Sequence, residues 1–346
     1  MTTLDLGALK GTCQKTKVLI NTVGPYHLYS TPVVQACALT GTHYVDATGE
    51  TPWESEMISK FHETAQNNRA IIIPGLGIES AISDMMTWSM ARIIRKKYDA
   101  GLGRVTVSVH DLGGRPSGGT LLTVLSILDT YGISGMAVVN KAFALSPVSG
   151  PEVQPNESLF SKITGVRTTP HLGTLTSSIS ASVNKAVVER SWGLLENGKL
   201  YGPNFSYAEY MRVKGFVTGV LLHYAFVFGA LALVFPPVRW LAKRLVTQPG
   251  QGPSKEAAAK EYLEYRAVAV ADRPEPNPPR AISRFRYDGG MYYLTAILLV
   301  EAAVVILEDP ALTDRFAGGL LTPAILGQPF IDRIQKSGIT FETDTL

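Results

Sequence analysis

The sequence predicts an α/β fold in which a parallel sheet is followed by a second, α+β domain with a long apolar helix. Three patterns support this prediction. Short runs rich in β-branched residues end at glycine or proline turns and alternate with helical stretches, as buried parallel strands do. Over residues 104–112, apolar and polar residues alternate as in an antiparallel strand with one wet face. Residues 215–235 form a run of 21 residues without Asp, Glu, Lys or Arg.

A βαβ unit lies within the first fifty residues. Its first strand begins at Val18 and stops at a Gly-Pro turn, its helix ends at Gly41, and its second strand covers residues 43–47. Strands joined in this way are parallel, and their crossover is right-handed. Because ligands of such sheets bind beyond the carboxyl ends of the strands, the loops at residues 21–26 and 46–50 are the first candidate site.

These two loops also have a simpler interpretation. Glycines turn a chain far more often than they bind a ligand, and Asp46 and Glu50 can cap or solvate a strand end. From the residue types alone, we therefore weigh a structural role of the loops above a binding role.

The predicted parallel unit continues with a helix, a strand and a second helix. The amphipathic helix covers residues 53–68, the strand residues 71–73, and the second helix residues 81–98. Asp84 is expected in the first turn of the second helix, where a carboxylate interacts well with the helix dipole. For Asp84 we weigh helix stabilisation above catalysis.

The second domain is predicted to open near residue 104 with a strand and a glycine-rich turn. Residues 113–120 lead directly into an apolar helix, and the backbone amides at such a helix start, with Arg115 nearby, can form an anion or carbonyl site. The alternative is an ordinary helix cap made by Ser117.

Two long apolar stretches raise the question of a membrane. Residues 215–235 are long enough to cross a bilayer core, since 21 residues of helix rise about 31 Å, and basic residues flank both ends. We expect a membrane-facing segment that spans the bilayer or lies on it; the alternatives are a buried helix and an apolar dimer surface. Residues 289–307 are also apolar but contain Glu301, so we expect that helix to be buried.

The composition excludes several classes of function. The formal charge of +3 is small for 346 residues, so nucleic-acid binding is not expected. The two cysteines and six histidines lack metal-ligand spacing, so we predict no metal site, and this cysteine usage fits a reducing compartment. The first residues lack the apolar core of a secretory signal.

An ordered set of motifs runs over nearly the whole chain. The motifs are NTVGPYHLYSTPVVQACALTGTHYVDATGE at 21–50, IIIPGLGIESAISD at 71–84, SGGT at 117–120, PGQGPS at 249–254, and YLTAILLVEAA, GGLLTPA and GITFE from residue 293 onward. Together they resemble the saccharopine dehydrogenase-like oxidoreductases, particularly the branch of the trans-acting enoyl reductases. The chain departs from that pattern at its start, because no glycine-rich phosphate-binding turn follows a strand before Val23. It looks like a family member without its first βα units.

The resemblance implies a fold and a domain organisation. Residues 1–103 are expected to form an incomplete, Rossmann-like dinucleotide-binding domain. Residues 104–346 are expected to form an α+β substrate and dimerisation domain that includes the apolar segment 215–235 and ends in a C-terminal helical return.

The resemblance also implies an activity and a site. The activity is that of an NAD(P)H-dependent oxidoreductase, with NADPH or NADH as cofactor, which reduces an enoyl thioester or a related lipid or polyketide intermediate. The expected residues are Val23, Gly24, Pro25, Asp46, Gly49 and Glu50 at the cofactor, Ser117, Gly118 and Thr120 at the substrate, and Tyr26 as proton donor. For Tyr26 the alternative is ring packing over the turn.

Partners and an alternative function complete the expectations. The expected partners are a small-molecule or acyl substrate, a second copy of the chain, and a membrane or lipid-droplet surface. The expected location is the cytoplasmic face of a membrane or a lipid droplet, and otherwise the cytoplasm. The alternative function is that of a truncated, catalytically inactive paralogue that binds a membrane or a partner protein, because no phosphate-binding turn is found.

Overall fold

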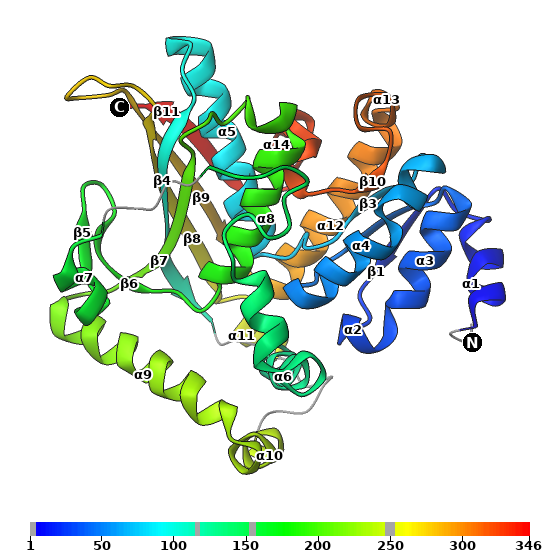
Figure 1. The fold of residues 1–346 in the computed structure, drawn as a ribbon, viewed down its shortest axis with the longest axis horizontal. Coiled ribbons are helices and arrows are strands. Elements are labelled where there is room, and N and C mark those ends of the chain that lie inside the picture. The colour runs from blue at the N-terminus through cyan, green and yellow to red at the C-terminus, as the bar shows by residue number, and fades with distance from the viewer. Residues whose placement is uncertain (1–4, 115–117, 152–156, 246–252) are drawn as a thin grey trace.

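The computed structural model describes residues 5–114, 118–151, 157–245 and 253–346. Within these residues, two sheets lie side by side, and helices pack between and around them (Figure 1). One sheet is parallel, with the strand order β1-β2-β3-β10, and the other has the order β11-β9-β8-β4-β7-β6-β5. The predicted combination of a parallel sheet with a second α+β portion is confirmed.

The parallel sheet forms from the short β-branched runs that predicted it. Its strands are β1 (Val18–Asn21), β2 (His43–Asp46), β3 (Ile71–Ile73) and β10 (Gly319–Leu320), and the helices around it are α1 (Leu6–Cys13), α2 (Tyr26–Tyr29), α3 (Thr31–Thr40) and α4 (Thr51–Asn67). β10 comes from the distant C-terminal part of the chain and pairs in parallel with β3. It was not predicted, because two residues carry no strand pattern.

β1 lies at the edge of the described sheet. It pairs in parallel with β2 on one side. Ile20 keeps 41% of its surface exposed, and Val23, just beyond the strand, keeps 58%. The open side of β1 therefore borders the first candidate loop.

The second sheet is centred on one long strand. Its strands are β4 (Leu102–Gly113), β5 (Arg167–Thr169), β6 (Gly173–Ser177), β7 (Ser206–Arg212), β8 (Tyr262–Ala271), β9 (Arg280–Asp288) and β11 (Thr340–Thr345). Val105, Val107 and Val109 of β4 face the common core, as their alternation predicted. The wet face that the same pattern predicted is wrong, because Thr106, Ser108 and His110 are buried too, under elements that pack on the other side of the strand. The antiparallel setting of β4 was predicted correctly on the β8 side and wrongly on the β7 side, where the pairing is parallel. The chain crosses over between β4 and β7, so it returns in the same direction.

Several helices join the two sheets into one core. They include α5 (Ser80–Tyr98), α8 (Ala181–Leu194), α12 (Met291–Glu308), α13 (Ala311–Phe316) and α14 (Gly327–Lys336), with the short α11 (Lys255–Ala258) and the 3-10 turns η1 (Glu196–Gly198) and η2 (Pro323–Leu326). In α12, Leu294, Leu298 and Ala302 are buried in the core. Glu301 leaves that core and binds Arg333 at 2.6 Å. The expected burial of this apolar helix is therefore confirmed for one of its faces.

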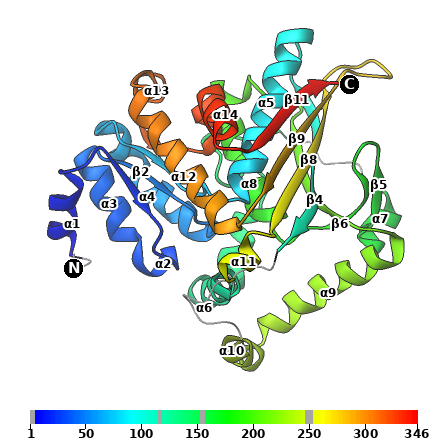
Figure 2. The same cartoon turned by 180° about the vertical axis from the view of Figure 1, so that it is seen from behind.

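The remaining helices lie towards the bottom of the molecule in the view of Figure 1. They are α6 (Gly118–Val139), α7 (Leu159–Thr164), α9 (Phe216–Val234) and α10 (Pro236–Leu245). α7 lies beside β5 and β6 (Figure 1). Figures 1 and 2 show α9 along the outside of the molecule, with α7 at one end and α10 at the other. Among the described residues, α9 and α12 are long and apolar enough to cross a membrane. In the most apolar 18-residue stretch of each helix, only 6% of the residues of α9 are buried, against 39% of those of α12.

Candidate functional site

The loops at the carboxyl ends of β1 and β2 meet through Glu50. The backbone N–H groups of Tyr26 and His27 each donate to one carboxylate oxygen of Glu50, at 2.7 Å. The Nδ1 of His27 lies 2.6 Å from Oε2 of Glu50, and both side chains are buried. The structure thus brings together the two loops that the sequence selected. It also uses the first amides of α2 for an internal carboxylate rather than for a ligand.

Asp46 ties β2 to the loop after β3. It is fully buried, and its Oδ2 accepts a hydrogen bond from the hydroxyl of Tyr44 at 2.6 Å. Its Oδ1 accepts from the N–H groups of Thr48 at 2.9 Å and Gly75 at 3.1 Å. Burial raises the pKa of Asp46 from 3.8 to about 6 against the opposing effect of these hydrogen bonds. The carboxyl group therefore holds the loop after β2 against the loop after β3.

Tyr26 packs over the turn. Its ring lies 6.1 Å from that of Trp53, and its hydroxyl accepts from the N–H of Ala47 at 3.4 Å. Burial, and then the charge of Asp46, raises the pKa of Tyr26 above its ordinary value. These contacts correspond to the packing alternative for this residue.

The other cofactor-side residues divide into an exposed and an enclosed group. Val23 is exposed beside the Gly24-Pro25 turn, and Gly24 faces the ring of Tyr26. Gly49 points the other way, since a Cβ placed there would lie 3.8 Å from both the Glu79 carboxylate and a methyl of Val183. The turn after β1 is therefore the accessible part of the predicted site.

The predicted substrate residues are placed only in part. Ser117 lies outside the described residues, as does the side chain of Thr120; Gly118 and Thr120 open α6. α6 meets the candidate loops further along, where the ring of Tyr131 lies 6.1 Å from that of His27. The hydroxyl of Tyr131 also donates to Glu56 of α4 at 2.9 Å.

Sequence reasoning missed a buried carboxylate in the second sheet. Glu209 of β7 is 3% exposed and accepts five side-chain hydrogen bonds between 2.7 and 3.0 Å. The donors are Ser178 and Ser180 to Oε1, and Ser83, Asn184 and Tyr207 to Oε2. The serine-rich stretch at 177–182 is the one signal in the sequence, because Ser83 comes from a distant segment and no local pattern marks Asn184 or Tyr207 as a donor.

Glu54 is a second buried acid that the sequence did not reveal. It is 3% exposed in the first turn of α4, and a Cβ placed on Gly75 would lie 3.4 Å from its Oε1. Burial, and then the charge of Asp46, raises the pKa of Glu54 to about 8, although Arg190 opposes this. Glu54 therefore holds a proton at neutral pH beside the loop after β3.

Asp84 does not serve as a helix-dipole carboxylate. α5 begins at Ser80, so Asp84 lies beyond the first turn, and that prediction was wrong. Its Oδ2 accepts from the N–H of Ala324 at 2.8 Å, while Oδ1 is buried with no hydrogen-bond partner among the described residues. Burial raises the pKa of Asp84 from 3.8 to about 7. The residue instead links α5 to the segment after β10.

We expect Asp84→Asn to flatten the pH dependence of stability. The folded chain keeps a proton on Asp84 that the unfolded chain loses above its pKa of 3.8, so this stabilisation is full below pH 3.8 and is lost as the pH rises through about 7. Between about pH 5 and pH 8, the free energy of unfolding of the wild type should fall by about 2 kcal/mol more than that of the variant. Urea unfolding at both pH values measures this. Asp332→Asn, at an exposed position, is the control, and equal slopes for wild type and Asp84→Asn would contradict the expectation.

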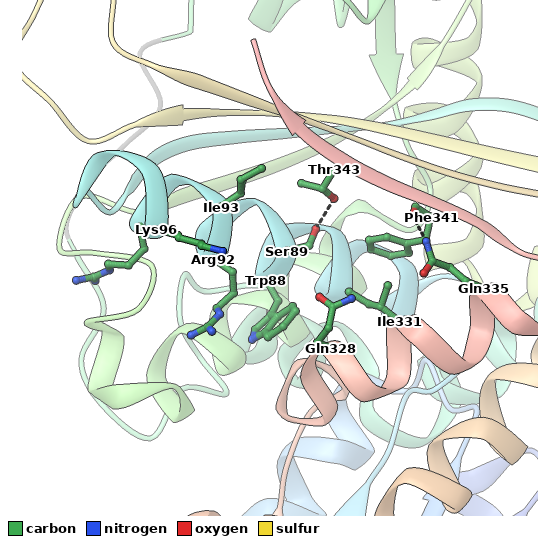
Figure 3. Close-up of a pocket in the computed structure, with 11 residues that line it drawn as sticks. Trp88, Ser89, Arg92, Ile93, Lys96, Gln328, Ile331, Gln335, Phe341 and Thr343 are labelled. Atoms are coloured by element: carbon green, nitrogen blue, oxygen red, sulfur yellow. Dashed lines mark hydrogen bonds between the residues drawn. The ribbon is translucent and has the colours of Figure 1, made fainter.

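A pocket of about 510 Å³ lies elsewhere, between α5, α14 and β11 (Figure 3). Trp88, Ile331 and Phe341 line it together with the basic Arg92 and Lys96. None of the predicted site residues lines this pocket. Its size therefore does not make it the candidate site, which is defined by the carboxyl edge of the parallel sheet.

A parallel sheet whose polar loops meet at its carboxyl edge is the arrangement of a Rossmann-like domain, and here it stands beside a mixed sheet. Residues 1–73 match the model of the saccharopine dehydrogenase NADP binding domain. The chain belongs to the saccharopine dehydrogenase-like oxidoreductase family.

Relatives and a solved structure support this assignment. The chain is 32% identical to a Mycobacterium tuberculosis protein named "Putative trans-acting enoyl reductase", over 98% of this chain and 82% of the relative. It is 28% identical to a trans-acting enoyl reductase of Mycobacterium bovis, over the same shares. The apo saccharopine dehydrogenase (L-Glu forming) of Saccharomyces cerevisiae matches with a TM-score of 0.51 at 12% identity, covering 99% of this chain and 87% of that one. This last likeness concerns the fold alone.

The described residues fit one end of a nicotinamide dinucleotide. The exposed turn at residues 23–25 follows a parallel strand, where the ring end of a dinucleotide can lie. The pyrophosphate of a dinucleotide is usually bound by free backbone N–H groups at the start of a helix. Around this turn the described residues do not offer such groups, because the N–H groups of Tyr26 and His27 already donate to Glu50. No group of three or more potential metal ligands occurs among the described residues.

Proposed function

We propose that this oxidoreductase is an enoyl reductase that uses NADPH or NADH to reduce an enoyl thioester. The observation that carries the proposal is the exposed turn at residues 23–25, which lies inside the matched NADP binding domain and beside loops locked by Glu50 and Asp46. The names of the relatives support the choice of substrate class.

The reaction requires two things of the protein. A bound dihydronicotinamide would give up the hydride of its C4–H bond to the β-carbon of the enoyl thioester, and the enolate left on the substrate would take up a proton at its α-carbon. The chain must hold the turn rigid, and Glu50 does so with three hydrogen bonds. It must also provide a proton, and Glu54 holds one at neutral pH because its pKa is raised to about 8.

The preference for Glu54 over Tyr26 as proton source follows from their environments. A proton donor works best when its pKa lies near the working pH. Burial raises the pKa of Tyr26 above its already high ordinary value and that of Glu54 to about 8. Glu54 therefore gives up its proton more readily.

The test is a titration of the purified chain with NADPH and with NADH, followed by nicotinamide fluorescence and by the melting temperature. We expect Val23→Asp to weaken binding at least tenfold without changing the melting temperature, because the side chain is 58% exposed and the new charge would repel an anionic cofactor. Val300→Asp, at a valine of α12 that is 49% exposed, is the matched control and should bind normally.

Oxidation of NADPH or NADH in the presence of a crotonyl thioester tests the substrate class. Binding without turnover of any enoyl thioester would remove the enoyl reductase assignment while leaving the cofactor. A folded chain that binds neither cofactor would contradict the proposal and favour the alternative of a catalytically inactive binding protein.

A further inference from the structure

The helices α7, α9 and α10 present one continuous apolar surface, which we call the α9 surface. Its members are each more than half exposed and include Leu159 and Phe160 of α7, Val217, Leu221 and Phe228 of α9, and Trp240 of α10. The rings of Phe160 and Phe216 stack at 5.6 Å, which joins α7 to α9. A soluble monomer rarely leaves so many large apolar side chains in one place, so this surface calls for a partner.

The polar side chains in the middle of α9 turn towards the protein. Nδ1 of His223 lies 2.8 Å from the hydroxyl of Ser177, and the hydroxyl of Tyr224 donates to the carbonyl of Ile163 at 2.9 Å. The hydroxyl of Thr176 donates to the carbonyl of Gly219 at 2.8 Å. The outward side of α9 therefore carries large apolar side chains and no charge.

Both ends of α9 are fastened to the body of the protein. Near its start, Gly219 sits so close to the end of β6 and its neighbours that a Cβ there would lie 2.8 Å from Val166. At its end, Arg239 donates to the carbonyls of residues 233 and 234 and pairs with Asp129 of α6 at 2.9 Å. Lys243 pairs with the same carboxylate. These contacts at both ends keep α9 along the surface of the molecule. If α9 crossed a bilayer, the contacts at one of its ends would have to break.

Cations stand at both ends of the α9 surface. Lys162 of α7 and Lys214 before α9 are exposed at one end. At the other end, Arg244 is exposed with its guanidinium 3.7 Å from the centre of the Trp240 ring. An apolar stripe with a basic rim and an aromatic residue at its border matches a bilayer that carries anionic headgroups.

We propose that the α9 surface docks onto an anionic lipid bilayer with α9 lying in the plane of the interface. A second copy of the chain is the competing occupant. A twofold contact through this surface would bring the two basic rims together, and like charges oppose such a contact. This inference does not depend on the proposed enzymatic function, because vesicle binding needs neither cofactor nor substrate.

The first test measures co-sedimentation of the full chain with vesicles of phosphatidylcholine, with and without one-third phosphatidylglycerol. We expect at least tenfold tighter binding to the anionic vesicles, with that advantage lost at about 0.5 M salt. The triple variant Leu221→Ser, Phe228→Ser, Leu231→Ser should lower binding at least tenfold. Val300→Ser with Leu307→Ser, at two exposed apolar positions on α12, is the matched control and should bind as the wild type does.

Trp240 supplies a second readout that needs no variant. It is 55% exposed, whereas Trp53, Trp88 and Trp192 are at most 9% exposed. When vesicles are added, the change in tryptophan fluorescence should therefore come from Trp240. Lipids that carry bromine near the headgroup should quench this fluorescence more strongly than lipids that carry bromine near the ends of the acyl chains. Stronger quenching by the deep bromines would overturn the in-plane arrangement. Vesicle binding that the triple variant leaves intact, or a dimer in solution that this variant converts to a monomer, would overturn lipid docking.

Discussion

Glu209→Ala should lower the free energy of unfolding by about 4 kcal/mol, which is the largest effect we expect from one substitution. The carboxylate accepts five hydrogen bonds from residues of four different segments, and all of these donors would lose their acceptor in a buried place. The cost of burying unpaired donors exceeds that of the missing side-chain volume.

Urea unfolding at neutral pH measures this effect. Glu209→Gln keeps the shape of the side chain, but its NH₂ group replaces one acceptor oxygen and faces the donors of that oxygen. The free energy of unfolding of this variant should therefore lie between those of the wild type and of Glu209→Ala. Glu342→Ala, at an exposed position of β11, is the control and should stay within about 0.5 kcal/mol of the wild type. If Glu209→Ala matched that control, the hydrogen-bond cluster would not contribute to stability.

Asp46→Ala should lower the free energy of unfolding by about 3 kcal/mol. Two backbone N–H groups and the hydroxyl of Tyr44 would lose their acceptor, and the loops after β2 and β3 would separate. Asp46→Asn retains one oxygen and should lose about half as much.

A second measurement separates the effect of Asp46 from global unfolding. Hydrogen exchange at the amides of Thr48 and Gly75 should accelerate in Asp46→Ala under native conditions, because these are the two N–H groups that Asp46 binds. Unchanged protection of both amides would show that another group holds the loops.

Much of the parallel sheet could be predicted from its sequence because the signals are local. The runs at residues 18–20 and 71–73 are apolar, the run at 43–47 has an apolar centre, and all three end at turn residues, so local sequence alone predicts three buried strands. β10 has no such signal, since two residues at 319–320 become a strand only through the edge of β3. Pairing partners far apart in sequence are the part that local patterns do not contain.

The candidate site divides in the same way. The turn at residues 23–25 and the loop at 46–50 could be found because parallel strands place ligands at their carboxyl ends. Glu209 and Glu54 could not, since burial and distant partners, rather than residue type, distinguish these carboxylates from surface acids. For Tyr26 the sequence left two interpretations open, and the ring contact with Trp53 could be seen only in the structure.

The late entry of β10 into the parallel sheet has a consequence for synthesis. β3 ends at Ile73, and its outer partner begins at Gly319, some 245 residues later. At a synthesis rate of about 5–20 residues per second, β10 emerges from the ribosome about 12–50 s after β3, so the outer edge of β3 has no partner strand during this time. During that interval a fully apolar strand, Ile71-Ile72-Ile73, has an unpaired backbone edge. The nascent chain is therefore most exposed to misassembly before residues 319–320 emerge, and a chaperone that shields this edge would raise its folding yield.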